Sequence, residues 1–164
     1  MNRIHIVGPK NHGKTTLVVD LVTEFCRRGI RVGTIKHSRH DHELDSPGKD
    51  SHRHRTAGSQ PAAIVTSDSL GIFLNRDGRD DYQRLLPLYA DCQIVLVEGD
   101  IDASSGIKVE VWRAAGGTVP LAAQRPDIAA IVSDDGPDVP IPVWPRNDLP
   151  SLADKIWELV RCPD

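Results

Sequence analysis

The sequence predicts an α/β fold in which helices form the outer layers of a three-layer sandwich around a mostly parallel central sheet. Three observations support this prediction. Short, apolar, β-branched segments alternate with amphipathic helical segments along the chain. Residues 1–36 contain a strand, a loop, a helix and a second strand, which together indicate a βαβ unit with a right-handed crossover. Residues 93–97 (QIVLV) are nearly all apolar, as in a strand that is buried on both faces of a parallel sheet.

Individual elements follow from local periodicity and from turn residues. Strands are expected at residues 3–7, 30–36, 62–66, 70–74, 93–97, 107–112 and 128–132. Helices are expected at residues 15–28, 50–57, 81–88 and 149–160. Either Asp50 or Ser51 could cap the second of these helices. The strand at 107–112 alternates in polarity and should be half exposed, and residues 136–145, with four prolines, should be irregular.

Composition limits the classes of protein to which the chain can belong. A length of 164 residues, with 39% hydrophobic and 26% charged residues, is typical of a single globular domain, here residues 1–164. The net charge of −3 and the aromatic content of 4% argue against a nucleic-acid partner. The three cysteines show no CxxC spacing, and no segment resembles a signal peptide or a membrane helix. A cytoplasmic protein without a membrane partner is therefore expected.

The strongest motif is the glycine-rich segment GPKNHGKT, which begins at Gly8 and ends at Thr15. It matches the pattern GxxxxGK[ST], follows a predicted strand and opens a predicted helix, as a P-loop requires. Backbone N–H groups of such a loop surround phosphates, the lysine reaches the β and γ oxygens, and the hydroxyl binds Mg²⁺. The motif predicts a P-loop NTPase-like fold that binds a purine nucleoside triphosphate at residues 8–16. The candidate phosphate-binding residues are Gly8, Lys10, Asn11, His12, Gly13, Lys14, Thr15 and Thr16.

A P-loop also needs a carboxylate at the end of a neighbouring strand to hold the Mg²⁺ and its water shell. Glu98 follows the apolar strand at 93–97 and precedes a glycine, so it is the candidate for this role. Thr15 and Glu98 are therefore the expected Mg²⁺ residues, and Lys14 and Glu98 the candidate catalytic residues. The alternative is that Glu98 is simply an exposed carboxylate at a strand end.

Residues 36–55 combine five of the seven histidines with basic and acidic residues. The histidines are His37, His40, His42, His52 and His54. Three interpretations are open: a transition-metal site, a second anion-binding surface facing the P-loop, and a solvated polar loop. No spacing matches a standard zinc motif, and basic groups near a phosphate site favour the anion-binding interpretation. Its candidate residues are Lys36, His37, Lys49, Asp50, Arg53, His54 and Arg55.

The segment 36–58 resembles the signature segment of the MobB family, the molybdopterin-guanine dinucleotide biosynthesis adaptor proteins. The P-loop before this segment, the Val97-Glu98-Gly99 sequence after it and residues 108–111 (KVEV) occur in the family's order. The resemblance covers residues 3–113 and is weak in the last third of the chain.

The resemblance implies a homodimeric P-loop protein that binds GTP and Mg²⁺ and hydrolyses GTP weakly. It also implies assistance to a MobA-type guanylyltransferase, which attaches GMP to molybdopterin, and it leaves open whether molybdopterin binds to this chain. Gly8, Gly13, Lys14 and Thr15 would bind the triphosphate, and Glu98 would belong to the second Mg²⁺ motif. The basic segment characteristic of the family would comprise Lys49, Asp50, Arg53, His54 and Arg55.

Two departures from the family pattern concern the nucleotide site. Asp100-Ile101-Asp102 stands where an aromatic residue and a lysine are usual, which weakens a phosphate-binding role for this loop. No NKxD element is present to recognise guanine, and only Asn147-Asp148 is a candidate for contacting the base. The alternatives are an ATP-dependent small-molecule kinase, a metal-insertion chaperone driven by GTP, and a domain whose nucleotide is only structural.

Overall fold

The computed structural model describes residues 2–39 and 44–161, which form two compact units. The first unit comprises Met1–Ser38 and Pro87–Asp164, and the second comprises Arg39–Leu86. His40, Asp41, His42 and Glu43 of the histidine-rich segment lie outside the described residues. The expectation of a single domain stays a prediction, and each unit is described by itself.

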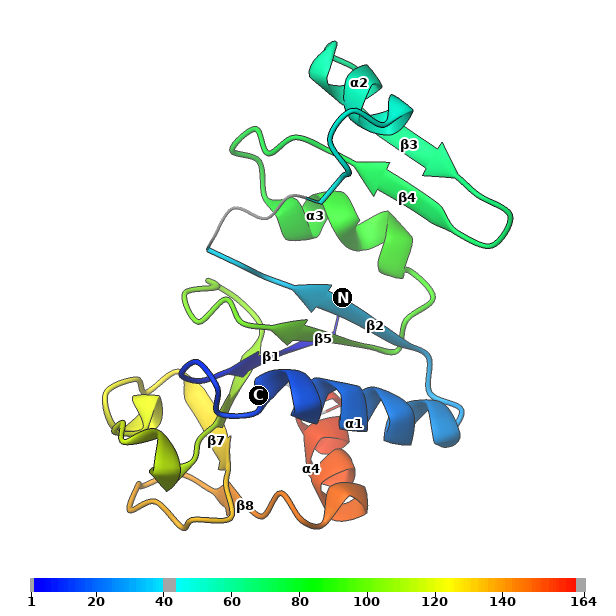
Figure 1. Cartoon of the computed structure of the whole chain (residues 1–164). Helices are drawn as coiled ribbons and strands as arrows, with labels where there is room; N and C mark the ends of the chain where they lie inside the picture. The colour runs from blue at the N-terminus through cyan, green and yellow to red at the C-terminus, as the bar shows by residue number, and fades with distance from the viewer. Residues whose placement is uncertain (1, 40–43, 162–164) are drawn as a thin grey trace. The chain divides into compact units, whose positions relative to one another are not determined.

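The first unit contains a six-stranded sheet in the order β2-β5-β1-β6-β7-β8, and every neighbouring pair is parallel (Figure 1). The strands are β1 (Arg3–Val7), β2 (Val32–Lys36), β5 (Ile94–Glu98), β6 (Ile107–Val111), β7 (Ile128–Val132) and β8 (Val143–Trp144). Because β1 lies between β5 and β6, the carboxyl ends of these three strands meet at one edge of the sheet.

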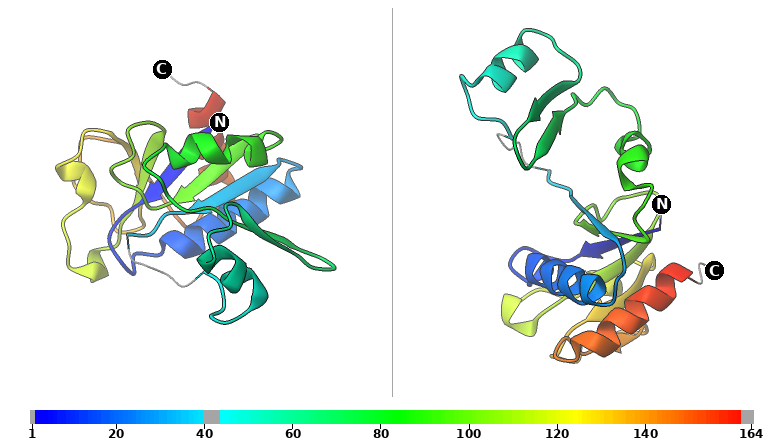
Figure 2. Two further views of the ribbon diagram at one scale, coloured as in Figure 1. Left: turned by 90° about the horizontal axis from the view of Figure 1, so that it is seen from above. Right: turned by 90° about the vertical axis from the view of Figure 1, so that its right-hand side faces the viewer.

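One face of this sheet is covered by α1 (Lys14–Arg27) and α4 (Leu149–Arg161), which lie side by side in Figures 1 and 2. Their apolar sides enter the same core as β1, where Leu17, Leu21 and Ile156 are fully buried. A second apolar cluster, which includes Trp112 and Ile131, lies apart from this core and receives Ala122 from the 3-10 helix η3 (Leu121–Ala123). The predicted α/β class with a mostly parallel sheet is confirmed.

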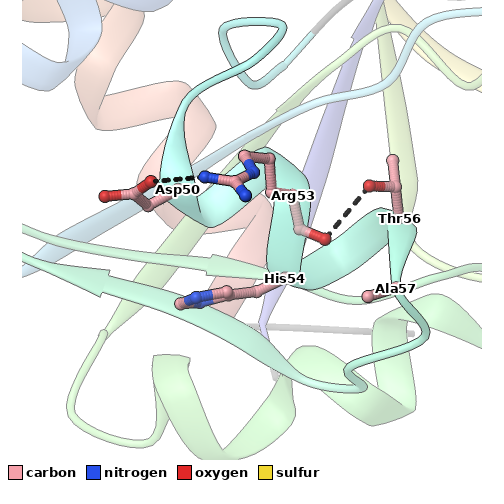
Figure 3. A pocket seen from close by; sticks show the side chains of 5 residues that line it. All are labelled: Asp50, Arg53, His54, Thr56 and Ala57. Carbon is pink, nitrogen blue, oxygen red and sulfur yellow. Dashed lines mark hydrogen bonds and ion pairs between the residues drawn. The ribbon is translucent and has the colours of Figure 1, made fainter.

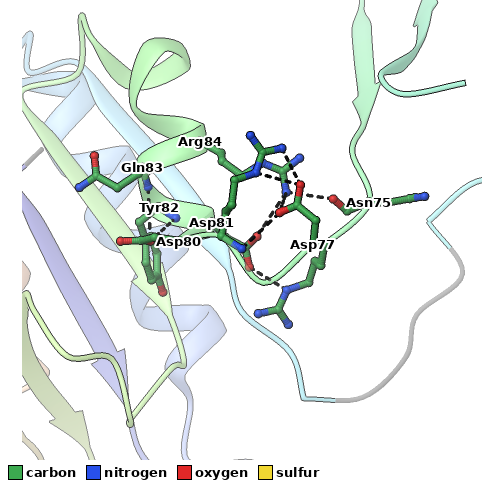
Figure 4. Close-up of polar contacts among 9 residues, drawn as sticks. Asn75, Asp77, Asp80, Asp81, Tyr82, Gln83 and Arg84 are labelled. Carbon is green, nitrogen blue, oxygen red and sulfur yellow. Dashed lines mark hydrogen bonds and ion pairs between the residues drawn. The ribbon is translucent and has the colours of Figure 1, made fainter.

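The second unit contains two short helices and a β-hairpin. Its elements are α2 (Asp50–Thr56), β3 (Ala62–Val65), β4 (Leu70–Phe73) and α3 (Asp81–Leu85). The strands β3 and β4 pair antiparallel, and apolar side chains such as Val65 and Leu70 are exposed on them. The Asp80 side chain caps α3 by accepting the Tyr82 and Gln83 N–H groups, beside ion pairs that join Arg84 to Asp77 and Asp81 (Figure 4).

The expected bounds of β1 and β7 are confirmed, whereas the exposure predicted for residues 107–112 is wrong. Strand β6 is buried because it lies between β1 and β7, and its polar side chains are paired inside the protein. Lys108 Nζ lies 2.8 Å from Asp127 Oδ2, and Glu110 accepts the N–H groups of Leu121 and Ala122 at 2.8 and 2.9 Å. Alternation of polarity in β6 therefore marks buried polar side chains, one in an ion pair and one bonded to backbone N–H groups, and does not mark a solvent-facing side.

Three further predictions of local structure need correction. The irregular segment 136–145 contains β8, which pairs with β7. The helix expected at 81–88 ends at Leu85 and continues as the 3-10 helix η1 (Leu86–Tyr89), since Pro87 cannot donate an α-helical hydrogen bond. Neither Asp50 nor Ser51 caps α2: Lys49 holds the cap position without a side-chain hydrogen bond.

Among the described residues, no helix is long and apolar enough to span a membrane.

Candidate phosphate-binding site

The glycine-rich loop connects β1 to α1 at the carboxyl edge of the sheet. Three of its residues have a positive φ: Gly8 at 137°, Asn11 at 67° and Gly13 at 93°. A β-carbon on Gly8 would lie 2.3 Å from the backbone oxygen of Val111, so only glycine allows the loop to pass this close to β6. The glycines of the motif are therefore required for the path that the loop takes beside β6.

The beginning of α1 is open to an anion. Gly13 occupies the cap position without a side-chain hydrogen bond, and the first turn contains no acidic residue. The first N–H groups of an α-helix have no partner within the helix, and together with the helix dipole they attract negative charge. A phosphate group can satisfy them, as the motif predicts.

Lys14 and Thr15 begin the helix and point to different partners. Lys14 Nζ donates to the backbone oxygen of Pro9 at 2.6 Å, which folds the lysine back over its own loop. Thr15 Oγ1 donates to Glu98 Oε1 at 2.8 Å, which joins α1 to the end of β5. Burial lowers the pKa of Lys14, an effect that Glu98 opposes and Lys36 strengthens.

Glu98 is the carboxylate at the end of β5, as the sequence predicts. Besides Thr15, it contacts Lys36, whose Nζ lies 2.7 Å from Glu98 Oε1. Burial favours the protonated form of Glu98, but hydrogen bonds from Lys36 and Thr15 and the charges of Lys36 and Lys14 outweigh it and lower the pKa. The group is therefore an ionised carboxylate beside a hydroxyl, a pair of hard oxygen donors that suits Mg²⁺.

The loop after β5 is bonded to the end of β2. The His37 N–H donates to the backbone oxygen of Glu98 at 2.9 Å, and His37 Nε2 lies 3.8 Å from Asp100 Oδ1. Asp102, the other acidic residue of this loop, lies 2.8 Å from an Arg125 guanidinium nitrogen. Both carboxylates thus have basic neighbours in the first unit.

His12 lies inside the protein with 2% of its surface exposed. Its Nδ1 accepts the N–H of Arg113 at 3.0 Å, so the ring connects the P-loop to the segment after β6. Lys10, Asn11 and Thr16 are exposed.

Asn147 and Asp148, the candidates for contacting the base, have different surroundings. Asp148 Oδ1 accepts the Ser151 N–H at the start of α4, and Asn147 is exposed.

The basic segment of the second unit is arranged differently. Lys49, Arg53 and His54 are exposed, and Arg53 lies 3.6 Å from Asp50 in an exposed pair beside a shallow hollow on α2 (Figure 3). Arg55 instead faces inward, with its Nε 3.9 Å from Asp45 Oδ2 and its guanidinium 5.7 Å from the centre of the Phe73 ring. That this segment faces the P-loop stays a prediction.

The metal-site interpretation finds no support in the described part of the chain, where no group of three or more histidine, cysteine or acidic residues is placed to hold a metal ion. His40 and His42, which this interpretation included, lie outside that part.

Sequence reasoning missed Arg113. It follows Trp112 at the carboxyl end of β6, and its guanidinium lies against Gly13 of the P-loop. The rule that identified Glu98, a polar residue at the carboxyl end of a strand that neighbours β1, also applies to Arg113. A half-exposed strand, as expected at residues 107–112, does not suggest a position beside the P-loop for the residue that follows it.

The parallel sheet, the glycine-rich turn and the uncapped helix define a P-loop NTPase-like α/β protein. Residues 3–134 match the family described as MobB, molybdopterin guanine dinucleotide synthesis protein B. The chain belongs to this family.

Individual relatives agree with this assignment. The chain is 31% identical over 152 residues to the molybdopterin-guanine dinucleotide biosynthesis adapter protein of Escherichia coli (strain K12), covering 89% of this chain and 86% of the relative. A crystal structure of a MobB homologue from Bacillus stearothermophilus superposes with a TM-score of 0.64 at 26% identity, covering 95% of this chain and 98% of the other. Bacillus subtilis MobB, at 21% identity and a TM-score of 0.70 over 96% and 97% of the two chains, shares the fold.

Proposed function

We propose that this protein binds GTP and Mg²⁺ at its P-loop, hydrolyses GTP weakly, and acts as an adapter in the synthesis of molybdopterin guanine dinucleotide. The observation that carries the nucleotide part is the uncapped start of α1, preceded by a loop with positive φ at Gly8 and Gly13 and bonded through Thr15 to Glu98. Family membership supports the adapter part.

The residues present fit a magnesium-bound triphosphate. Backbone N–H groups of the loop from Gly8 to Gly13 bind phosphate oxygens, with Lys10, Asn11 and Thr16 at its rim. Lys14 leaves the Pro9 oxygen and binds the β and γ oxygens. Thr15 and Glu98 would hold Mg²⁺, which would supply positive charge to stabilise the phosphates. The proposed preference of this site for guanine over adenine is supported only by what the resemblance to the MobB family implies.

Weak hydrolysis follows from the side chains that the loop offers. The loop residues bind and orient phosphate, and a fast GTPase also needs a group that positions the attacking water. His12 is the one imidazole in the loop, and its Nδ1 already accepts the Arg113 N–H at 3.0 Å. It therefore acts as a structural link and is not a general base.

The proposed partner is a MobA-type guanylyltransferase, as the resemblance to the family implies. The E. coli relative, an adapter protein of molybdopterin-guanine dinucleotide biosynthesis, supports a partner enzyme in that synthesis. Lys49, Arg53 and His54 are exposed on one short segment, which supports contact with an anionic group of molybdopterin or of that partner. The exposed apolar side chains of the β3–β4 hairpin, such as Val65 and Leu70, support a homodimer.

Titration with fluorescent GTP and ATP analogues in Mg²⁺, with phosphate release followed in the same samples, tests this proposal. Lys14→Ala should weaken GTP binding by about tenfold to hundredfold, because it removes charge-assisted contacts. Lys155→Ala is the matched control. Lys155 belongs to α4, and its Nζ lies 5.9 Å from the centre of the Trp144 ring. Its loss should change GTP binding by less than about twofold.

Two outcomes would contradict the proposal. Preference for ATP, with turnover that rises sharply when metabolites are added, would favour a small-molecule kinase. Stoichiometric binding of a divalent transition metal, coupled to GTP hydrolysis, would favour a metal-insertion chaperone.

A further inference from the structure

Arg113 lies on the opposite side of the P-loop from Glu98. β5 and β6 flank β1, so the residues that follow these two strands approach the loop from its two sides. The flat guanidinium of Arg113 covers Gly13: its Nη2, Cζ and Nε atoms lie 3.1, 3.4 and 3.6 Å from the position that a β-carbon on Gly13 would take. The guanidinium therefore stands at the start of α1.

The backbone of Arg113 is held on both sides. Its N–H donates to His12 Nδ1 at 3.0 Å, and its oxygen accepts the Gly116 N–H at 3.1 Å. A β-carbon on Gly116 would lie 2.1 Å from His12 Nε2, so this glycine leaves room for the buried ring. Trp112 anchors the same segment through a 2.9 Å bond from its Nε1 to the Thr118 oxygen. The buried ring of His12 thus fixes Arg113 relative to the P-loop.

The side chain of Arg113 has no carboxylate within ion-pair distance among the residues that the structure describes, whereas several other arginines of the first unit are paired. Arg28 pairs with Glu24, Arg125 with Asp127, and Arg146 with Asp20. The Arg113 guanidinium instead lies over Gly13 at the positive end of the α1 dipole, and the first turn of this helix contains no acidic residue. Arg113 and the helix dipole thus both present positive charge at the start of α1, and a bound anion would be attracted to both.

We propose that Arg113 is a ligand of the terminal phosphate of the bound nucleotide, and that His12 is its positioning residue. This inference rests on the proposed nucleotide binding and deepens it, because it makes Arg113 the residue that distinguishes a triphosphate from a diphosphate. Glu98 and Thr15 approach the phosphates from the β5 side with the metal, and Arg113 approaches from the β6 side. A guanidinium can donate two parallel hydrogen bonds to a phosphate, which a lysine cannot reproduce.

Calorimetric titration of the whole chain with the non-hydrolysable analogue GMPPNP and with GDP, both in Mg²⁺, tests this role without reference to turnover. Arg113→Ala should weaken GMPPNP binding by about tenfold to hundredfold and GDP binding by less than about twofold. Arg113→Lys should fall between wild type and Arg113→Ala for GMPPNP. Arg161→Ala, which removes an exposed arginine at the end of α4, is the matched control and should bind both nucleotides as wild type does.

Variants of His12 separate positioning from folding. His12→Ala should reproduce the selective loss of GMPPNP affinity, and His12→Asn should restore part of it, because the amide oxygen can replace Nδ1 as the acceptor of the Arg113 N–H. Equal losses for GMPPNP and GDP in Arg113→Ala, or unchanged GMPPNP affinity, would overturn the inference and leave the proposed function intact. Failure of wild type to bind either nucleotide would instead refute the proposed function, and the inference with it.

Discussion

The two units each carry a cluster of basic residues, and the clusters differ in what holds them. The P-loop cluster consists of Lys14, Lys36 and Arg113, and the α2 cluster consists of Lys49, Arg53, His54 and Arg55. Members of the P-loop cluster are placed by the central sheet: Lys36 ends β2, Arg113 follows β6, and Lys14 begins the helix that follows β1. Members of the α2 cluster lie on one helix of seven residues or, in the case of Lys49, at its N-terminal cap position.

The difference teaches that charge density along the sequence does not reveal which basic residues the fold gathers at the start of a helix. The α2 cluster is the denser of the two along the sequence, and both clusters contain ion pairs: Arg53 with Asp50 and Arg55 with the buried Asp45 on α2, and Lys36 with Glu98 beside the P-loop. The P-loop cluster is spread over about a hundred residues of sequence. It is gathered by strand order at the uncapped start of α1, whose first N–H groups and helix dipole favour an anion.

The largest expected effect is on the free energy of unfolding, when a glycine of each unit is replaced by alanine. Gly8 and Gly58 both have a positive φ, at 137° and 106°. A β-carbon on Gly8 would overlap the Val111 oxygen at 2.3 Å, whereas one on Gly58 would meet no atom within 4 Å. Gly8→Ala should therefore lower the free energy of unfolding by about 3 kcal/mol or more, through strain and a backbone clash together. Gly58→Ala should cost only the strain, about 1–2 kcal/mol.

Urea denaturation of both variants measures this contrast. A cost for Gly8→Ala no larger than that for Gly58→Ala would mean that the loop can move away from β6, and that the P-loop is not held by its path along Val111.

A smaller effect is expected within the α2 cluster. Arg55→Ala removes the cation beside Asp45, a carboxylate that is 8% exposed and accepts the Ser51 hydroxyl at 3.0 Å. It also removes the contact with Phe73. The second unit should lose about 1–2 kcal/mol of stability. Arg53→Ala, on the same helix, breaks only an exposed pair and should stay within about 0.5 kcal/mol of wild type.

Amide hydrogen exchange in the β3–β4 hairpin reports the stability of this unit. The double variant Asp45→Asn/Arg55→Ala should recover part of the loss, because it no longer buries an unpaired charge. Equal behaviour of Arg55→Ala and Arg53→Ala would show that Arg55 is as dispensable to the fold as Arg53.

Much of the first unit could be predicted because its signals are local. The β-branched runs of β1 and β7, the glycines of the loop and the apolar face of α4 each reflect a backbone preference or a periodicity. Glu98 could be found because it ends an unmistakably buried strand.

The parts that could not be predicted depend on tertiary neighbours. Lys108 and Glu110 resemble solvent-facing positions until Asp127 and the N–H groups of η3 are placed beside them. The two-residue strand β8 exists only because β7 offers an edge. Arg113 has the same sequence character as any exposed arginine, and its position over Gly13 follows from the order of the strands.

The most direct test of the comparison is amide hydrogen exchange of the wild-type chain with and without GTP and Mg²⁺. Binding at the P-loop cluster should slow exchange in peptides covering residues 8–16 and 113–118, and leave peptides covering residues 49–57 unchanged. Protection of residues 49–57 with no change at residues 8–16 would place the nucleotide at the α2 cluster and contradict the account.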